Sequence, residues 1–249
     1  MSLQIGMNYF PIKDVLIENK NFKNSFNALR IVQLSDLHLN KRVSLDYLEK
    51  LVDEVNQIDP HIVVITGDIL QTKAINVKEH LSIFKKFRSK VYFVTGNHDM
   101  YYGVKELKKE MSDNGLICMD NKIEILRHVD NSAFQLVGLS DRYSLLRGIK
   151  RHVKELFSKL DSNLPTILLA HQPKDIYKIG SNRIDVQLSG HTHGGQIYPF
   201  SMLVKVFQPY FSGLYTYNKT LLYVNNGLGY WGVNIRYKAK SEIAVLTIN

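Results

Sequence analysis

Five short polar clusters bring together side chains of the kinds that bind metal ions. Each cluster follows an apolar, β-branched run of the kind that forms a strand. A single Asp-x-His or Gly-Asp pair after such a run would be weak evidence for a metal site. Four polar or flexible residues in a row, at 96–99, have no packing reason to follow such a run. The clusters are Asp36-Leu37-His38, Gly67-Asp68, Gly96-Asn97-His98-Asp99, His171 and Gly190-His191-Thr192-His193-Gly194-Gly195. Their recurrence at five strand-like exits predicts one shared site.

Seven of the clustered side chains form a mixed oxygen and nitrogen ligand set of two carboxylates, one amide and four imidazoles. Such a set suits Mn, Zn or Fe better than Mg or Ca, which prefer oxygen ligands alone. Seven side chains are too many for one ion, whereas a bridging Asp can span two ions about 3.5 to 4 Å apart. We therefore predict two divalent metal ions with these ligands: Asp36, His38, Asp68, Asn97, His171, His191 and His193.

The local spacing suggests how individual ligands reach the ions. Asp36 and His38 are two residues apart, and in an extended segment such residues face the same side. Asp68 follows Gly67 at a strand exit, where its carboxylate could bridge both ions. Asn97 supplies a neutral oxygen, which leaves His98 free to act on a substrate. The histidines outside the clusters are expected to have no role in the site; they are His61, His80, His128 and His152.

Apolar runs predict the strands that precede the clusters, at residues 29–34, 62–66, 91–95, 166–170 and 184–188. Between them lie stretches of helical period, at residues 44–58, 76–87, 104–112 and 150–160. The first of these begins at Ser44, a favoured N-cap, and stops at Asp59-Pro60. The alternation predicts a largely parallel sheet with helices outside and the clusters beyond the carboxyl ends of its strands.

Further strand-like runs interrupt that alternation, at residues 122–126, 134–139, 221–224 and 243–248. They suggest a second, mixed sheet packed on the first. No repeat, low-complexity tract or linker divides the sequence, so residues 1–249 are expected to form a single domain.

Composition narrows the class of partner. The formal net charge is +9 with a pI near 9.4, which suits an anionic partner such as a phosphate ester, a nucleic acid or an acidic membrane surface. The lysines are spread along the chain and no block of like charges reaches five, so no dedicated nucleic-acid surface is expected. The single cysteine, Cys118, excludes an intramolecular disulfide and is expected to be an inert buried thiol.

The sequence contains no apolar run of 18 residues and no signal-like start, since polar residues interrupt residues 1–20. The chain as given is therefore expected to be cytoplasmic, or membrane-associated or exported if a native N-terminal segment was removed. No protein partner can be inferred from the sequence.

In order along residues 36–193, the five clusters resemble the motifs of the calcineurin-like metallophosphoesterase superfamily, which read Asp-x-His, Gly-Asp, Gly-Asn-His-(Asp/Glu), His and Gly-His-x-His. The sequence is most similar to a bacterial subgroup of small, often membrane-anchored or exported members. That likeness rests on residues 35–39, 194–196, 212–215, 227–229 and 242–243. The chain has Asn225-Asn226 where the subgroup usually has an Arg shortly before Gly-Leu-Gly.

The resemblance implies an α/β fold of two mixed β-sheets packed as a sandwich flanked by helices, the αββα metallophosphoesterase fold. It also implies two ligand sets that share one carboxylate. The first set is Asp36, His38, Asp68 and His193, and the second is Asp68, Asn97, His171 and His191.

The resemblance and the ligand chemistry together predict a phosphoesterase acting on phosphodiesters or phosphomonoesters. A hydroxide that bridges the metal ions would attack phosphorus. His98 would protonate the leaving group or stabilise the equatorial oxygens, and Asp99 would orient His98 through a hydrogen bond. Gln196 and Arg236 lie in segments expected near the site and are candidate substrate contacts.

The substrate is less defined by the sequence. Residues 198–217 are rich in aromatic side chains without a clear period. They either form a loop that packs on the sheet, or line a pocket for a small-molecule or lipid-linked ester. The same aromatic side chains could also lie at a membrane surface. Two further classes stay open. One is a nuclease using the same chemistry, and the other is a catalytically weak binding module that kept the fold.

Overall fold

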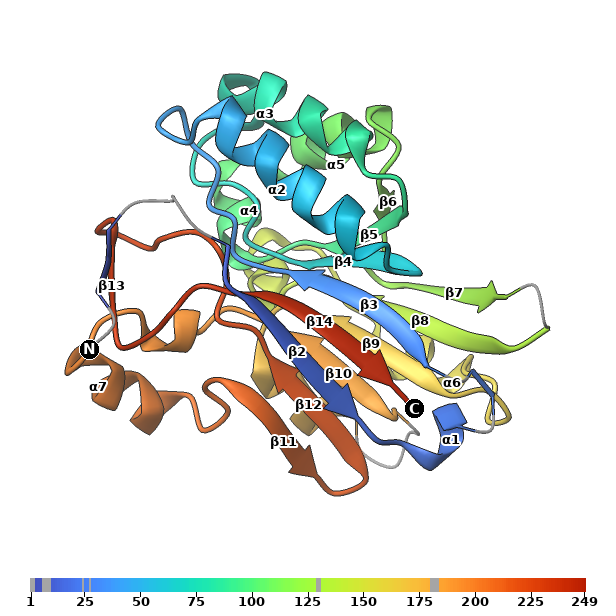
Figure 1. Cartoon of the computed structure of the whole chain (residues 1–249). Coiled ribbons are helices and arrows are strands. Elements are labelled where there is room, and N and C mark those ends of the chain that lie inside the picture. The colour runs from blue at the N-terminus through green and yellow to red at the C-terminus, as the bar shows by residue number, and fades with distance from the viewer. Residues whose placement is uncertain (1–2, 6–9, 24, 27, 129–130, 180–183) are drawn as a thin grey trace.

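Two six-stranded sheets pack face to face in the computed structural model, which describes residues 3–5, 10–23, 25–26, 28–128, 131–179 and 184–249 (Figure 1). The first sheet has the order β2 (Ile12–Ile17), β14 (Ile243–Ile248), β3 (Leu29–Leu34), β4 (Ile62–Thr66), β5 (Lys90–Val94) and β6 (Ile117–Cys118). The second has the order β11 (Gly213–Tyr217), β12 (Thr220–Val224), β10 (Val186–Ser189), β9 (Thr166–Ala170), β8 (Ala133–Leu139) and β7 (Lys122–Arg127). A separate pair joins β1 (Leu3–Ile5) to β13 (Ile235–Tyr237).

Both sheets are mixed. In the first, β3 to β6 run parallel and β14 pairs antiparallel with β3. In the second, β8, β9, β10 and β12 run parallel, with β7 and β11 antiparallel at the two edges. Parallel strands need crossover connections, which is why helical segments alternate with strands along the sequence.

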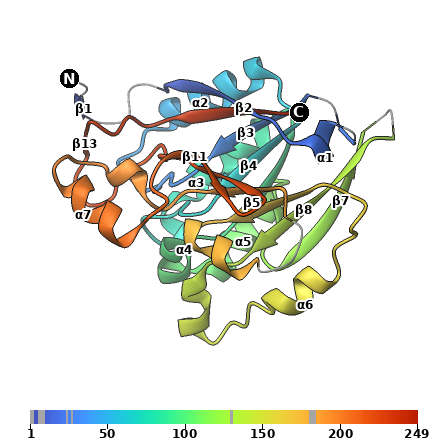
Figure 2. The same ribbon diagram turned by 90° about the horizontal axis from the view of Figure 1, so that it is seen from below.

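The hydrophobic core forms three layers. Side chains of β3, β4 and β5 meet those of β8, β9 and β10 between the sheets, as at Val64, Tyr92 and Leu169. On the outer face of the first sheet lie α2 (Leu45–Ile58), α3 (Lys78–Ile83) and α5 (Val104–Asp113). On the outer face of the second lie α6 (Val153–Ser158) and a 3₁₀ turn at Pro173–Lys178, which Figure 2 shows from below. Strands buried on both faces read as continuous apolar runs, as observed for β4 and β9.

The expected α/β sandwich flanked by helices is confirmed. The strands predicted at 29–34, 62–66, 166–170 and 243–248 have these bounds in the structure. The helix after Ser44 is also confirmed, with the Ser44 side chain accepting a hydrogen bond from the Tyr47 N–H at 3.2 Å. Among the described residues, none of the helices has both the length and the apolar character needed to cross a bilayer.

Two features differ from the expectations. The five strands that precede the polar clusters do not share one sheet, because β3, β4 and β5 belong to the first and β9 and β10 to the second. Part of the aromatic stretch at 198–217 forms a helix, α7 (Phe200–Phe207), followed by β11. Pro199 is the N-cap residue of that helix, where its missing N–H costs no intrahelical hydrogen bond. Residues 180–183, just before one predicted strand, lie outside the described part of the chain.

Candidate metal centre

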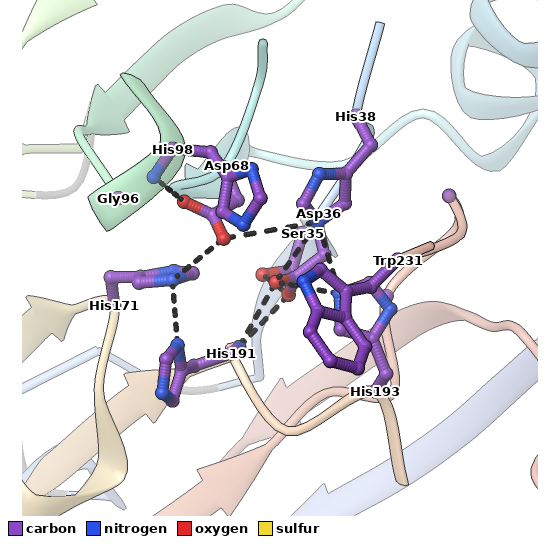
Figure 3. A network of polar contacts seen from close by, with 12 residues as sticks. Ser35, Asp36, His38, Asp68, Gly96, His98, His171, His191, His193 and Trp231 are labelled. Atoms are coloured by element: carbon purple, nitrogen blue, oxygen red, sulfur yellow. Dashed lines mark hydrogen bonds and ion pairs between the residues drawn. The ribbon is translucent and has the colours of Figure 1, made fainter. Parts of the chain in front are cut away.

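The seven predicted ligands converge where the carboxyl ends of strands from both sheets meet. Asp36 and His38 follow β3, and Asp68 follows β4. Asn97 begins α4 (Asn97–Tyr102) after β5, His171 follows β9, and His191 and His193 follow β10. Figure 3 shows His38 and His193 on one side, His171 and His191 on the other, and Asp68 between them. The sandwich architecture therefore gathers residues that are up to 157 positions apart in the sequence.

Among the described residues, three groups of side chains offer ligand atoms within 4.8 Å of one another. The first is Asp36, His38 and His193, and the second is Asp68, His171 and His191. A third group joins His38, Asp68 and His98. The first two groups fall inside the two ligand sets that the sequence resemblance implied, and Asp68 stands between them.

In the first group three atoms that could bind a metal ion face one another. His193 Nε2 lies 3.4 Å from Asp36 Oδ1 and 3.0 Å from His38 Nε2. The other ring nitrogen of His38, Nδ1, lies 2.7 Å from Gln71 Oε1 and donates to it, because a carbonyl oxygen only accepts. A neutral His38 then directs the lone pair of Nε2 toward His193, where a cation would satisfy both rings.

In the second group the ring of His171 is held in the same way. Its Nδ1 lies 2.8 Å from the Thr66 carbonyl oxygen and donates to it, so Nε2 faces inward. Around Nε2 lie Asp68 Oδ2, Asn97 Oδ1 and His191 Nδ1, each at 3.2 Å. One proton on Nε2 could serve only one of these three atoms, whereas a divalent cation would satisfy the whole set. The donor chemistry of both groups fits divalent ions with mixed nitrogen and oxygen ligands.

In the metal-free site, burial and the charge of the Asp68 carboxylate shift the pKa values of the surrounding side chains. Although burial opposes the effect, the Asp68 carboxylate raises the pKa of His171 well above its ordinary value. Burial lowers the pKa of His38 to about 4 and, together with the charge on His171, lowers that of His191 to about 3. Burial raises the pKa of Asp36 to about 6. The pocket thus disfavours additional protons on His38 and His191, which leaves their rings available as ligands.

Backbone conformation differs from the extended geometry expected at residues 36–38. Asp36 and His38 both adopt left-handed φ angles, 50° and 47°. Asp68, His191 and His193 share this conformation, with φ of 51°, 74° and 52°. Such angles are uncommon for non-glycine residues and concentrate at functional sites. Asp36 and His38 therefore reach one site by turning at each residue rather than by sharing a face of an extended strand.

Glycines leave room for the carboxylates. A Cβ on Gly96 would collide with the Asp68 carboxylate, and a Cβ on Gly190 would collide with Ser35 and Asp36. The backbone of His191 donates to both oxygens of Asp36, at 3.2 and 3.0 Å. The glycines of two polar clusters are thus required by the close approach of backbone to ligand.

His98 lies at the edge of the centre with its ring beside the ring of His38, 4.7 Å between centroids. Its backbone N–H donates to Asp68 Oδ1 at 2.8 Å, and its buried Nδ1 has no hydrogen-bond partner among the described residues. Burial lowers its pKa. These contacts hold the ring next to the metal ligands while leaving a nitrogen free.

Asp99 does not make the hydrogen bond to His98 that the sequence suggested. Its carboxylate accepts from the backbone N–H groups of Leu70, at 2.9 Å, and Gly96, at 2.8 Å. Burial and the nearby Asp68 raise the pKa of Asp99 to about 8, and the two backbone donors act in the opposite direction. In the structure Asp99 fastens the loop after Asp68 to the start of α4.

Arg236 and Gln196, the two candidate substrate contacts, both hold the backbone of neighbouring loops. Arg236 is only 1% exposed and donates to the carbonyl oxygens of His193, Asn226, Gly227 and Gly229. Its Nη2 also lies 3.2 Å from His193 Nδ1. Gln196 donates to the carbonyl oxygens of Trp231 and Val233 and accepts from the Trp231 N–H.

A cavity of about 510 Å³ opens beside the ligands. Asp68, Asn97, His98 and His191 line its inner end. Its other walls are largely apolar, from Ile197, Val204, Trp231 and Val233. Three residues of the site carried no signal in the sequence: Gln71 and Thr66, which orient imidazoles, and Trp231, which lines the cavity.

Comparisons with known proteins agree with this geometry. The family model described as calcineurin-like phosphoesterase matches residues 29–195. An uncharacterised metallophosphoesterase of Campylobacter jejuni is 36% identical over 241 residues, which cover 95% of this chain and 63% of the relative. A zebrafish protein described as a transmembrane protein with a metallophosphoesterase domain is 32% identical over 95% of this chain and 57% of the relative. The chain thus spans about 60% of the length of these relatives.

Among solved structures, a dimetal phosphatase from zebrafish superposes with a TM-score of 0.56 at 12% sequence identity. The superposition covers 81% of this chain and 88% of that structure. At this level of identity the likeness concerns the fold alone.

Proposed function

This chain belongs to the calcineurin-like phosphoesterase family, and we propose that it is a metal-dependent phosphoesterase that hydrolyses a phosphodiester or phosphomonoester at a dinuclear centre. The observation that carries the proposal is the pair of ligand groups on either side of Asp68. When bound, two divalent ions would supply an activated water and neutralise charge on the phosphoryl oxygens. The mixed donor set favours Mn, Zn or Fe.

We assign Asp36, His38, Asp68 and His193 to one ion and Asp68, Asn97, His171 and His191 to the other. Gln71 and the Thr66 carbonyl hold His38 and His171 in the tautomers that turn Nε2 toward the centre. Fixing the second ring nitrogen in this way is a common means of orienting imidazole ligands.

We assign His98 the role of general acid toward the leaving oxygen. Its ring lines the cavity next to the ligands and packs beside the His38 ring, and its backbone N–H donates to the Asp68 carboxylate. A group that keeps one nitrogen free and lies in the cavity can transfer a proton to a departing oxygen.

We infer that the ester carries an apolar group, such as a lipid chain. Ile197, Val204, Trp231 and Val233 form the walls beyond the ligands, and apolar walls with few polar groups suit an apolar ligand portion. The zebrafish relative described as a transmembrane protein is consistent with an enzyme that works close to lipid. A nuclease would need to accommodate a polar, charged chain along these same walls.

The test combines metal analysis with hydrolysis. After reconstitution with Mn, Zn, Fe or Mg, the chain is expected to hold near two ions and to hydrolyse bis-(p-nitrophenyl) phosphate. Long-chain alkyl phosphodiesters are expected to show a lower KM than short-chain ones. Absence of both metal and turnover would sink the enzymatic assignment, and faster cleavage of DNA or RNA than of alkyl esters would favour the nuclease.

A further inference from the structure

Exposed apolar side chains surround the mouth of the cavity on two neighbouring segments. One segment is α7, and the other runs from Trp231 through β13 to Lys238. We refer to the following residues as the α7 face: Met202, Val206, Phe207, Trp231, Val233 and Lys238. Val206 is 76% exposed, Phe207 70% and Trp231 51%. Large apolar side chains that are exposed together on neighbouring segments are typical of an interaction surface.

The two segments are parts of one surface. Val204 and Gln208 of α7 line the same cavity as Trp231 and Val233. The Tyr198 N–H, just before α7, donates to the Tyr237 carbonyl oxygen at 3.1 Å. Lys238 Nζ lies 4.1 Å from the centre of the Tyr198 ring. One side of α7 therefore closes the cavity while Met202 and Val206, four residues apart, point outward.

The charged side chains that this stretch of sequence contributes are all basic. No Asp or Glu occurs between Asp185 and Glu242, a stretch that includes all of the α7 face. Lys238 and Lys240 lie in the same stretch and are exposed. Apolar and aromatic side chains combined with lysines, without acidic groups, are typical of surfaces that enter the headgroup region of anionic membranes.

The α7 face is also fastened to the metal centre. Thr192 lies between His191 and His193, and its hydroxyl donates to the Phe211 carbonyl oxygen at 2.6 Å. A side chain on Gly195 would collide with Ser201 of α7 and with Phe211. The ligand loop therefore contacts the start of α7 directly at Gly195 and Ser201, beside the cavity that the two segments share.

We propose that the α7 face docks on an anionic lipid bilayer, with Trp231 at the headgroup level and the cavity mouth turned toward the membrane. The docking needs no catalysis, so it can be tested independently of the proposed hydrolysis. A membrane-bound orientation of this kind would allow a lipid-linked ester to reach the apolar walls without crossing water.

Trp231 is the only tryptophan of the chain, which makes its intrinsic fluorescence a direct probe of the face. We expect a blue shift when the full chain is mixed with vesicles of phosphatidylcholine containing about one-third phosphatidylglycerol. With phosphatidylcholine alone the shift should be much smaller, and added salt should weaken it. Flotation of the same mixtures measures the bound fraction.

The decisive variant is Val206→Glu/Phe207→Glu, which changes the face but neither a metal ligand nor a cavity-lining residue. We expect vesicle binding to fall at least about tenfold while hydrolysis of bis-(p-nitrophenyl) phosphate is unchanged. The matched control is Ile75→Glu, since Ile75 is 70% exposed in the 3₁₀ turn Ala74–Val77 on the opposite layer of the molecule. This control should bind vesicles as the parent chain does.

Three results would overturn the proposal: no binding to either vesicle type, equal binding by the parent and the double variant, or a dimer in solution that the double variant dissociates while vesicles have no effect. The last result would assign the face to a second copy of the chain. Vesicle binding by a chain that hydrolyses no ester would refute only the proposed function.

Discussion

The His98 backbone N–H donates a 2.8 Å hydrogen bond to Oδ1 of Asp68. This bond leaves Oδ2 of Asp68 free to face the imidazoles, 3.2 Å from His171 Nε2 and 3.8 Å from His38 Nε2. One carboxylate is thereby presented to both sides of the centre, in the position that a bridging ligand requires.

Asp68→Ala should therefore remove both metal ions rather than one. Because two-metal stabilisation of charge at phosphorus contributes several kcal/mol, we expect turnover to fall by more than about a thousandfold. Metal content by mass spectrometry and hydrolysis of bis-(p-nitrophenyl) phosphate check the two effects. Retention of one tightly bound ion would show that Asp68 does not bridge.

His98→Ala should lower turnover by about 10² to 10⁴-fold, the usual contribution of general acid catalysis, with metal content unchanged. The loss should be larger for an alkyl ester than for a p-nitrophenyl ester, whose leaving group needs little protonation. His80→Ala is the matched control, since His80 is a part-buried histidine that bonds the Val43 carbonyl oxygen away from the centre. Loss of an ion from His98→Ala would identify His98 as a ligand, in line with the group it forms with His38 and Asp68.

Gly96→Ala should displace the Asp68 carboxylate, because the new methyl group would occupy the same space. We expect weaker metal binding together with a loss of about 1–3 kcal/mol in the free energy of unfolding, typical of overpacking. Gly115→Ala is the comparison, since no atom lies within 4 Å of the added methyl group and only the backbone angle of +86° is unfavourable. If Gly96→Ala binds metal as the parent chain does, the close packing against Asp68 is not required.

Arg236→Met should lower the free energy of unfolding by about 3–5 kcal/mol, because it leaves several buried carbonyl oxygens without a donor. Burial already lowers the pKa of Arg236 to about 10. Denaturant unfolding of the metal-free protein measures the loss. If Arg236 instead contacts phosphate, stability should change little and the KM for a phosphoester should rise.

Cys118 should react slowly with alkylating reagents. Burial raises the pKa of its thiol, so at any given pH the reactive thiolate is a smaller fraction than for a free cysteine. The rate of alkylation should therefore keep increasing with pH beyond about 8.5, where an unperturbed thiol is half ionised. A rate equal to that of free cysteine near neutral pH would contradict this.

The sequence was sufficient to predict which polar side chains gather in one place, because each stands at the end of an apolar strand, where a polar cluster has no packing function. It did not predict how they are divided between two sheets, since a run such as 166–170 reads the same in either sheet. Gln71 and Arg236 show a second limit. Their roles depend on contacts with His38 and His193, which are 33 and 43 residues away and which no local pattern encodes.

Helix α7 was missed for a related reason. It has only eight residues, fewer than the window of about 11–18 residues over which a helical period is recognised, and its position depends on packing against Gly195. For Asp99 the sequence suggested a contact that the structure does not have. Proximity in sequence to His98 suggested a contact between the two side chains, whereas the first turn of α4 directs Asp99 to backbone donors.

The separation of the ligands between the sheets has a mechanical consequence. The first sheet contributes Asp36, His38, Asp68 and Asn97, and the second contributes only imidazoles, from His171, His191 and His193. Neither sheet alone offers a complete coordination shell, so bound ions would cross-link the two sheets of the sandwich. Sliding of one sheet over the other would open the shell, and chelation should therefore lower the melting temperature as well as the activity.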